Sequence, residues 1–254
     1  MSKHQLGYIV FGLFTLIYVF GYLNLGWSLS YFIWGFVAWF LLILYGSFFI
    51  QTNYHLKALT KVKTNKKVVA ITFDDGPSSY TKEVLDLLEK YNAKASFFCV
   101  GKNVAQEPEL LKLIIEKGHL VGNHTYSHSK DIGFSWTKTV KAEIEKTDEV
   151  IEKYGGAKPR YYRPPFGVTN PRISRALNKT QHEVIGWNIR SLDTFIHDES
   201  KIYNRIIRQI HPGSIILLHD TSERSVKVLE RLLIYLDSNN YRSVTVEGLL
   251  KETT

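Results

Sequence analysis

Two long apolar segments open the chain, and they constrain its fold more than any other feature. Leu6–Leu25 and Tyr31–Ile50 contain no charged residue, and each has about the 20 residues that cross a bilayer as a helix. Neither segment has the polar stripe of a surface helix, and the second segment argues against a cleaved signal peptide. We therefore predict a two-helix transmembrane hairpin within residues 1–56, with membrane lipids as its partner through residues 6–50.

The positive charge of the chain is concentrated around this hairpin. The formal net charge is +8, and residues 1–73 carry +6 of it, because they contain six lysines and no acidic residue. The rest of the chain is close to neutral, so no nucleic-acid partner is expected. Lysines lie outside both ends of the hairpin, which by the positive-inside rule favours a cytoplasmic location for the domain after the hairpin. Residues 57–66 are predicted to be a basic tether.

From residue 67 onward, short β-branched runs alternate with helical patterns. The predicted strands are 67–73, 95–100, 119–122, 160–163, 183–187, 214–218 and 241–246. The predicted helices are 79–91, 108–117, 137–154, 171–177, 199–210 and 226–236. Seven strands that alternate with helices are typical of parallel βα units in an α/β fold. We favour a closed or partly open barrel over a doubly wound sheet, although this pattern is compatible with both.

Polar side chains follow the ends of these predicted strands. In chain order they are Asp74, Asp75, His124, His128, Arg163, Asp193 and His219. In parallel α/β barrels, active sites are built at the carboxyl ends of the strands. We therefore expect these residues to share one site.

Four of these residues suggest a metal centre. Asp74 and Asp75 repel each other unless a cation or a shared proton relieves them, although one of them would suffice as an ordinary helix cap. His124 and His128 have the i,i+4 spacing that places two imidazoles on one face of a helical turn, and the alternative is a pair of surface histidines. With Asp75 as third ligand, they would hold a divalent metal and leave a position for water.

Two further motifs have both a structural and a catalytic interpretation. The segment 163–167 (RPPFG) ends a strand in a rigid turn, and the simpler interpretation is a structural turn. In the catalytic interpretation, Arg163 binds a carboxylate through paired hydrogen bonds, and a backbone N–H faces a developing oxyanion. His219 ends a buried strand, and it is either a core-edge histidine or a general acid.

Together the motifs resemble those of the polysaccharide deacetylase family, the NodB-homology domains of carbohydrate esterase family 4. The motifs are TFDDGP (72–77), HTYSH (124–128), RPPFG (163–167) and LLHD (217–220). The resemblance covers about residues 66–250 and implies a distorted (β/α)7 barrel, which we place at residues 67–254, after the hairpin. It also implies a metal-dependent hydrolase of carbon–nitrogen bonds other than peptide bonds, which removes an N-acetyl or other N-acyl group from an amino sugar of a glycan.

The resemblance assigns roles residue by residue. It implies that Asp75, His124 and His128 bind one divalent metal ion. Zinc is the first choice, and cobalt, nickel or manganese are the alternatives. The implied catalytic residues are Asp74 as general base, His219 as general acid, Arg163 and Asp193 as their respective partners, and Phe166, whose backbone N–H would hold the oxyanion. The implied substrate-binding residues are Pro165, Trp187 and Leu217, of which Leu217 would line the acyl pocket.

One motif departs from the family pattern. Where the family often has Asp-x-x-Asp-Trp, Arg190 replaces the first Asp and Thr194 replaces the Trp, which alters the substrate groove.

The substrate depends on which side of a bacterial cell membrane the domain faces. Members of the family usually face outward, and an outward-facing domain would meet peptidoglycan or exported polysaccharide. An inward-facing one would meet a lipid-linked sugar, as do family members that deformylate a lipid-linked aminosugar. A catalytically silent glycan-binding scaffold is the alternative from a different class.

Overall fold

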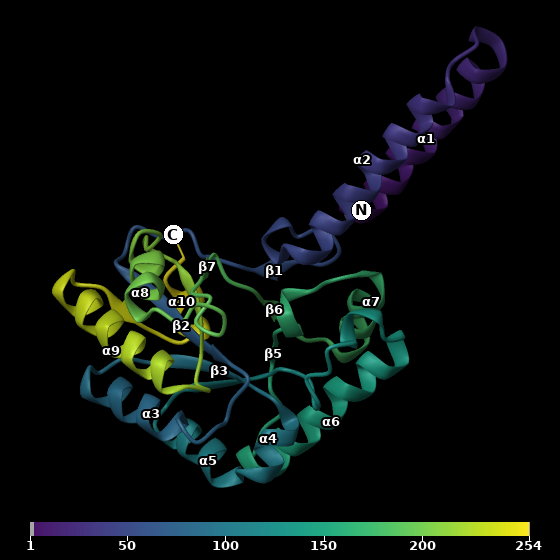
Figure 1. Ribbon diagram of the computed structural model, residues 1–254. Coiled ribbons are helices and arrows are strands. Elements are labelled where there is room, and N and C mark those ends of the chain that lie inside the picture. The colour runs from purple at the N-terminus through teal and green to yellow at the C-terminus, as the bar shows by residue number, and fades with distance from the viewer. Residues whose placement is uncertain (1–2, 254) are drawn as a thin grey trace.

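The computed structural model describes residues 3–253 and consists of a long helical hairpin that projects from an α/β domain (Figure 1). The hairpin helices are α1 (Lys3–Leu25) and α2 (Leu29–Phe48), and the Ser28 side chain caps the start of α2. Both helices are long and apolar enough to cross a membrane, and only 11% and 6% of their most apolar windows are buried within the protein. The predicted apolar helices are therefore present, with large hydrophobic side chains facing outward.

The domain is built on a curled sheet in which neighbouring strands are parallel (Figure 1). Nine strands occur within the described residues, in the order β1-β6-β5-β4-β3-β2-β8-β7, with β9 paired to β2. Their bounds are β1 Ala58–Leu59, β2 Val68–Asp74, β3 Ala95–Cys99, β4 Leu120–Asn123, β5 Tyr161–Tyr162, β6 Glu183–Ile185, β7 Ile189–Arg190, β8 Ile215–His219 and β9 Arg242–Ser243. The curled parallel sheet confirms the predicted α/β barrel class.

Helices cover the outside of this sheet, as Figure 1 shows. Their bounds are α3 Thr81–Lys90, α4 Gly101–Gln106, α5 Pro108–Glu116, α6 Thr137–Gly155, α7 Pro171–Thr180, α8 Glu199–Ile207, α9 Glu223–Ser238 and α10 Val246–Lys251, with short 3-10 turns η1 Ile50–Thr52, η2 Ile132–Phe134 and η3 Pro165–Gly167. Local sequence explains several boundaries. For example, the Asn170 side chain accepts hydrogen bonds from the N–H groups of Arg172 and Ile173, and Pro171 occupies the first turn of α7.

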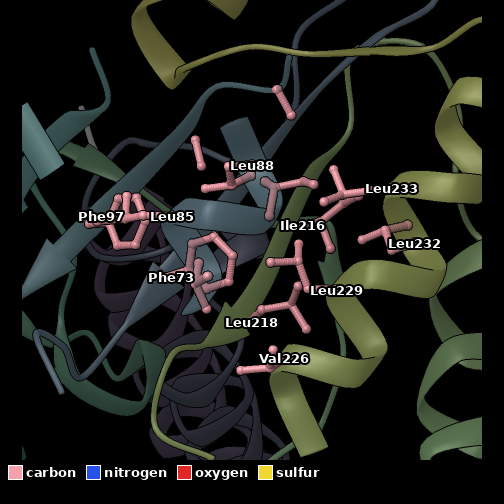
Figure 2. Close-up of a cluster of buried hydrophobic side chains, with 14 of the residues drawn as sticks. Phe73, Leu85, Leu88, Phe97, Ile216, Leu218, Val226, Leu229, Leu232 and Leu233 are labelled. Atoms are coloured by element: carbon pink, nitrogen blue, oxygen red, sulfur yellow. The ribbon is translucent and has the colours of Figure 1, made fainter. Parts of the chain in front are cut away.

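The core lies between the sheet and its helices. All seven residues of β2 are buried, as expected for a central strand of a parallel sheet. Figure 2 shows Ile216 and Leu218 of β8 beside Leu229 of α9, within a cluster that also contains the stacked rings of Phe73 and Phe97. This packing gives the carboxyl ends of β2 and β8 a rigid support.

Several sequence predictions differ from the observed elements. Seven strands were expected and nine are observed within the described residues. The additional strands β1 and β7 were missed because each has only two residues and therefore shows no periodicity. Helix α4 was also missed, since it is only six residues long. The predicted strand 241–246 was wrong at its end: the side chain of Thr245 accepts a hydrogen bond from the N–H of Gly248 and starts α10 instead.

The segment between the hairpin and β2 is built into the domain. Strand β1 pairs with β6, and the N–H of Val62 donates to the carbonyl oxygen of Gly213 at 2.9 Å. The predicted tether at 57–66 is therefore partly a sheet element. The end of α2 also contacts the domain, because the N–H of Thr169 donates to the carbonyl oxygen of Ser47 at 2.9 Å, and Ile50 is buried in the core.

Candidate active site

The polar residues at the strand ends meet on one side of the sheet. In the parallel register Asp74 lies opposite His219 on β8 and opposite Phe98 on β3, so these strand ends share one edge. A pocket of about 240 Å³ opens there. Its wall is formed by Asp74, Asp75, His124, His128, Phe166, Trp187, Arg190, Thr194, Phe195, Leu217 and His219.

Asp75, His124 and His128 form a compact group of metal-ligand atoms. One donor atom from each lies within 4.8 Å of the others, and the Nε2 atoms of His124 and His128 lie 3.4 and 3.2 Å from Oδ1 of Asp75. The Nδ1 atom of His124 lies 2.8 Å from the carbonyl oxygen of Arg163. Because a carbonyl oxygen can only accept, Nδ1 carries a proton, and in the neutral imidazole Nε2 presents a lone pair to the site.

The chemistry of this group fits a divalent cation. Oδ1 of Asp75 is buried and makes no hydrogen bond within residues 3–253. Burial opposes ionisation of Asp75, but the neighbouring imidazoles of His124, His128 and His219 outweigh it and hold its pKa below the usual range. One carboxylate and two imidazoles leave a coordination position open, which is the donor set of many catalytic zinc sites.

Arg163 lies behind the pocket and orients Asp74. Its guanidinium is fully buried, and Nη1 donates to Oδ1 of Asp74 at 2.7 Å and to Oγ1 of Thr72 at 2.8 Å. The other donors reach the carbonyl oxygens of Ile185 and Gly186 at 3.1 and 3.0 Å. Since each donating nitrogen has an acceptor, the buried cation is satisfied and fixes one oxygen of Asp74, while Oδ2 lies 3.8 Å from Nε2 of His124.

His219 lies on the pocket wall and is paired with the buried Asp193. Its Nδ1 atom lies 2.8 Å from Oδ1 of Asp193, whose carboxylate also accepts from the hydroxyls of Ser191 and Ser225 at 2.7 Å each. Burial alone would lower the pKa of His219, but the hydrogen bond and charge of Asp193 raise it to about 9. The imidazolium therefore faces the pocket, with Nε2 3.8 Å from Oδ2 of Asp75.

Comparison with known proteins agrees with this geometry. Residues 61–185 match the family model for polysaccharide deacetylase. The chain is 34% identical over 197 residues to a peptidoglycan-N-acetylglucosamine deacetylase of Bacillus cereus, an alignment that covers 75% of this chain and 92% of that protein. The chain belongs to the polysaccharide deacetylase family. It is therefore a hydrolase that acts on carbon–nitrogen bonds other than peptide bonds, in a family of metal-dependent glycan deacetylases.

Two further relatives show the range of the family. The peptidoglycan deacetylase PdaC from Bacillus subtilis has a solved structure with a TM-score of 0.70 and 33% identity, covering 75% of this chain and 93% of that one. A family 4 pseudoenzyme from Bacillus anthracis has a TM-score of 0.72 at 26% identity, covering 78% of this chain and 70% of that one. Since the same fold occurs in a pseudoenzyme, catalysis depends on the residues at the site and not on the fold alone.

The deacetylase motif at 124–128 has a different backbone from the one expected. We predicted a helical turn from the spacing of the two histidines, and this was wrong: residues 124–128 form no helix. Thr125 and His128 adopt positive φ angles of 64° and 49°, which bring the imidazole centroids to 4.9 Å. Glu143 on α6 holds this loop, because its Oε2 accepts from the N–H groups of Tyr126 and Ser127 at 3.1 and 2.8 Å.

The predicted substrate-binding residues separate into two groups. Trp187 and Leu217 line the pocket, whereas Pro165 is buried and lies outside its wall. Phe166 is on the wall, with a φ of 60° and its ring centroid 4.8 Å from that of His128. Next to it, a Cβ atom on Gly167 would lie 2.5 Å from the Trp187 ring, so this turn requires glycine.

Sequence reasoning missed two residues of the site. Phe195 lies on the pocket wall and is 70% exposed, although it belongs to none of the recognised motifs. A large aromatic side chain directly after Thr194 was the available signal. Glu143 had no signal, since it is one of several acidic residues on an amphipathic helix.

Proposed function

We propose that the protein is a membrane-anchored, metal-dependent deacetylase that removes an N-acetyl group from an amino sugar of peptidoglycan or a related glycan. The observation that carries this proposal is the convergence of Asp75, His124 and His128 with Asp74 and His219 in one pocket. Relatives that share the fold are named as deacetylases of N-acetylglucosamine and of N-acetylmuramic acid in peptidoglycan. Other N-acyl groups are the alternative substrates.

Asp75, His124 and His128 would hold the metal ion, with zinc as our first choice and cobalt, nickel or manganese as alternatives. When bound, such an ion supplies Lewis-acid polarisation and makes water more acidic. Asp74 is the general base in this proposal. Its carboxylate is held through Oδ1 by Arg163, which leaves Oδ2 to take a proton from the attacking water.

Two groups would complete the reaction. The backbone N–H of Phe166 donates to the oxyanion that develops on the acyl carbonyl, and Leu217 and Trp187 shape the space for a small acyl group. His219 then donates its Nε2 proton to the leaving amine, which Asp193 favours by keeping the imidazole protonated. The carbon–nitrogen bond breaks, and acetate and a free amino sugar leave.

For the membrane part, we propose that residues 1–56 form an integral hairpin anchor and that residues 67–254 form the catalytic domain. The exposed apolar surface of α1 and α2 supports insertion into a bilayer. The peptidoglycan relatives favour an outward-facing domain. The lysines around the hairpin favour the cytoplasmic face, where the substrate would be a lipid-linked amino sugar, and this is the second candidate function.

The central test uses the full-length chain in detergent micelles. We expect acetate release from N-acetylated peptidoglycan fragments after zinc or cobalt is added, loss of activity with a chelator, and recovery when metal is returned. Asp74→Asn should reduce the rate by about 100-fold or more. Asp131→Asn is the matched control, because this exposed carboxylate lies outside the pocket. A folded protein that binds no metal would contradict the proposal and favour the silent scaffold.

The side of the membrane is tested separately. Lys251→Cys on α10 introduces an exposed thiol, whereas the native Cys99 is buried. In intact bacterial cells, a membrane-impermeant maleimide should label this thiol if the domain faces outward. Labelling that appears only after lysis would support the lipid-linked sugar instead.

A further inference from the structure

Arg190 is a cation on the wall of the catalytic pocket without an acidic partner. It is half-buried, and no hydrogen bond or ion pair formed among residues 3–253 involves its guanidinium. Its carbonyl oxygen accepts from Nε of Arg205 at 2.8 Å, which fixes the backbone at this point. Arg163 provides the contrast, because each nitrogen of its guanidinium donates to a buried acceptor.

The nearby carboxylates are already committed to other groups. Asp74 is bound by Arg163 at 2.7 Å, and Asp193 is bound by His219 at 2.8 Å. The guanidinium carbon of Arg190 lies 5.7 Å from the ring centroid of Trp187, a contact that leaves its N–H donors free. The pocket therefore contains an arginine whose donors are left for a ligand.

The remaining wall indicates what kind of ligand this would be. Phe166 and Phe195 are exposed and offer aromatic surface to a sugar ring, whereas Trp187 is nearly buried, and Arg190 lines the same pocket. A guanidinium binds a carboxylate or a phosphate through paired N–H donors. A neutral sugar would partly desolvate this cation without compensation, whereas an acidic sugar would neutralise it.

We propose that Arg190 forms an anion subsite beside the N-acyl pocket, so that the preferred substrate is an amino sugar that carries a carboxylate or a phosphate. This inference rests on the proposed deacetylase function and specifies the substrate class of the same site. N-acetylmuramic acid has such a carboxylate, and N-acetylglucosamine does not. A sugar phosphate supplies the same oxyanion chemistry from a different source.

The test compares matched substrates on the metal-loaded, full-length protein. The substrates are a glycan fragment with free muramic acid carboxylates, its methyl ester, a neutral N-acetylglucosamine oligomer and N-acetylglucosamine phosphate. The wild type should prefer one of the two acidic substrates, and which one it prefers identifies the source of the anion. Arg190→Gln should raise KM for the preferred acidic substrate by about tenfold to a hundredfold. This increase in KM should be at least about tenfold larger than the increase for the matching neutral substrate.

Two variants separate the charge of Arg190 from its packing. Arg190→Lys should recover part of the preference, because it restores the charge without the paired donors. Arg175→Gln on α7 removes an exposed charge outside the pocket and should leave the preference intact. Equal losses on acidic and neutral substrates would overturn the inference, as would a wild type that prefers the neutral oligomer.

A binding measurement keeps this result distinct from the proposed function. N-acetylmuramic acid, N-acetylglucosamine phosphate and neutral N-acetylglucosamine are titrated by calorimetry into the metal-loaded wild type and into Arg190→Gln. Tighter binding of the acid that disappears in Arg190→Gln would support the subsite even if no acetate were released. Acetate release without any difference in binding between either acidic sugar and N-acetylglucosamine would support the deacetylase and overturn the anion subsite.

Discussion

Nδ1 of His219 lies 2.8 Å from Oδ1 of Asp193, and this contact makes the imidazole a proton donor at neutral pH. A carboxylate can only accept, so Nδ1 carries a proton and Nε2 is the atom that exchanges protons with the pocket. The second oxygen of Asp193 accepts from the backbone N–H of His219 at 2.9 Å, which fixes the orientation of the pair. The pair therefore sets both the direction and the acidity of the proposed general acid.

The first prediction concerns the pH dependence of catalysis. With the pKa of His219 near 9, kcat/KM in the wild type should fall on the alkaline side as pH rises through about 9. In Asp193→Asn the stabilising carboxylate is gone while burial remains, so this alkaline limb should move down by about 1 pH unit or more. Asp198→Asn, an exposed cap of α8, should leave the limb unchanged. An unshifted limb in Asp193→Asn would assign the alkaline limb to another group.

The same pair predicts a pH-dependent difference in stability. Because the folded pKa of His219 is above its usual 6.5, its contribution is fully present below about pH 6.5 and is lost as pH rises through about 9. The melting temperature of the wild type should therefore exceed that of Asp193→Asn most at pH 6, and this gap should narrow by pH 10. A constant gap across this range would show that Asp193 acts through packing alone.

The buried pair of Arg163 and Asp74 predicts strong coupling. Arg163→Met would leave the Asp74 carboxylate buried without its cation, which costs about 3–5 kcal/mol in the free energy of unfolding. Adding Asp74→Asn should recover part of this loss, so the two changes are not additive. Arg160→Met is the control, because its ion pair with Glu183 is exposed to solvent and contributes little to stability. Denaturant unfolding followed by circular dichroism measures the wild type, the single variants Arg163→Met and Asp74→Asn, their double variant and the control Arg160→Met.

Much of this site could be predicted from the sequence because its residues come directly after recognisable strands. The β-branched run before Asp74 and the apolar run before His219 both form central strands, and parallel pairing brings their ends together. The helical stripe of α9 was equally readable, since its buried residues recur at helical spacing. Regular periodicity is a local property, so the sequence alone reveals it.

The rest depends on contacts between distant parts of the chain. The acceptors of Arg163 include the carbonyl oxygens of Ile185 and Gly186, which lie 22 and 23 residues away and appear only once β5 and β6 are paired. The strained backbone of the 124–128 loop has a similar origin. Thr125 keeps its φ of 64° while its carbonyl oxygen accepts from the N–H of Gly101 at 2.9 Å, and Glu143 accepts from the N–H of Ser127 at 2.8 Å. Residue spacing suggested a helix there, but tertiary hydrogen bonds determine the loop.

The last prediction tests how that loop supports the metal ligands. Oε2 of Glu143 accepts from the N–H of Ser127 at 2.8 Å and from its hydroxyl at 2.9 Å, so Glu143→Ala frees the segment that carries His128. Zinc affinity, measured by competition with a chromophoric chelator, should fall by about 10- to 100-fold. Glu143→Gln keeps an acceptor oxygen and should lose less zinc affinity than Glu143→Ala. The control is Glu145→Ala, which should bind zinc normally because the Glu145 carboxylate pairs with Lys141 on the same helix. Unchanged affinity in Glu143→Ala would mean that the loop keeps its shape without this anchor.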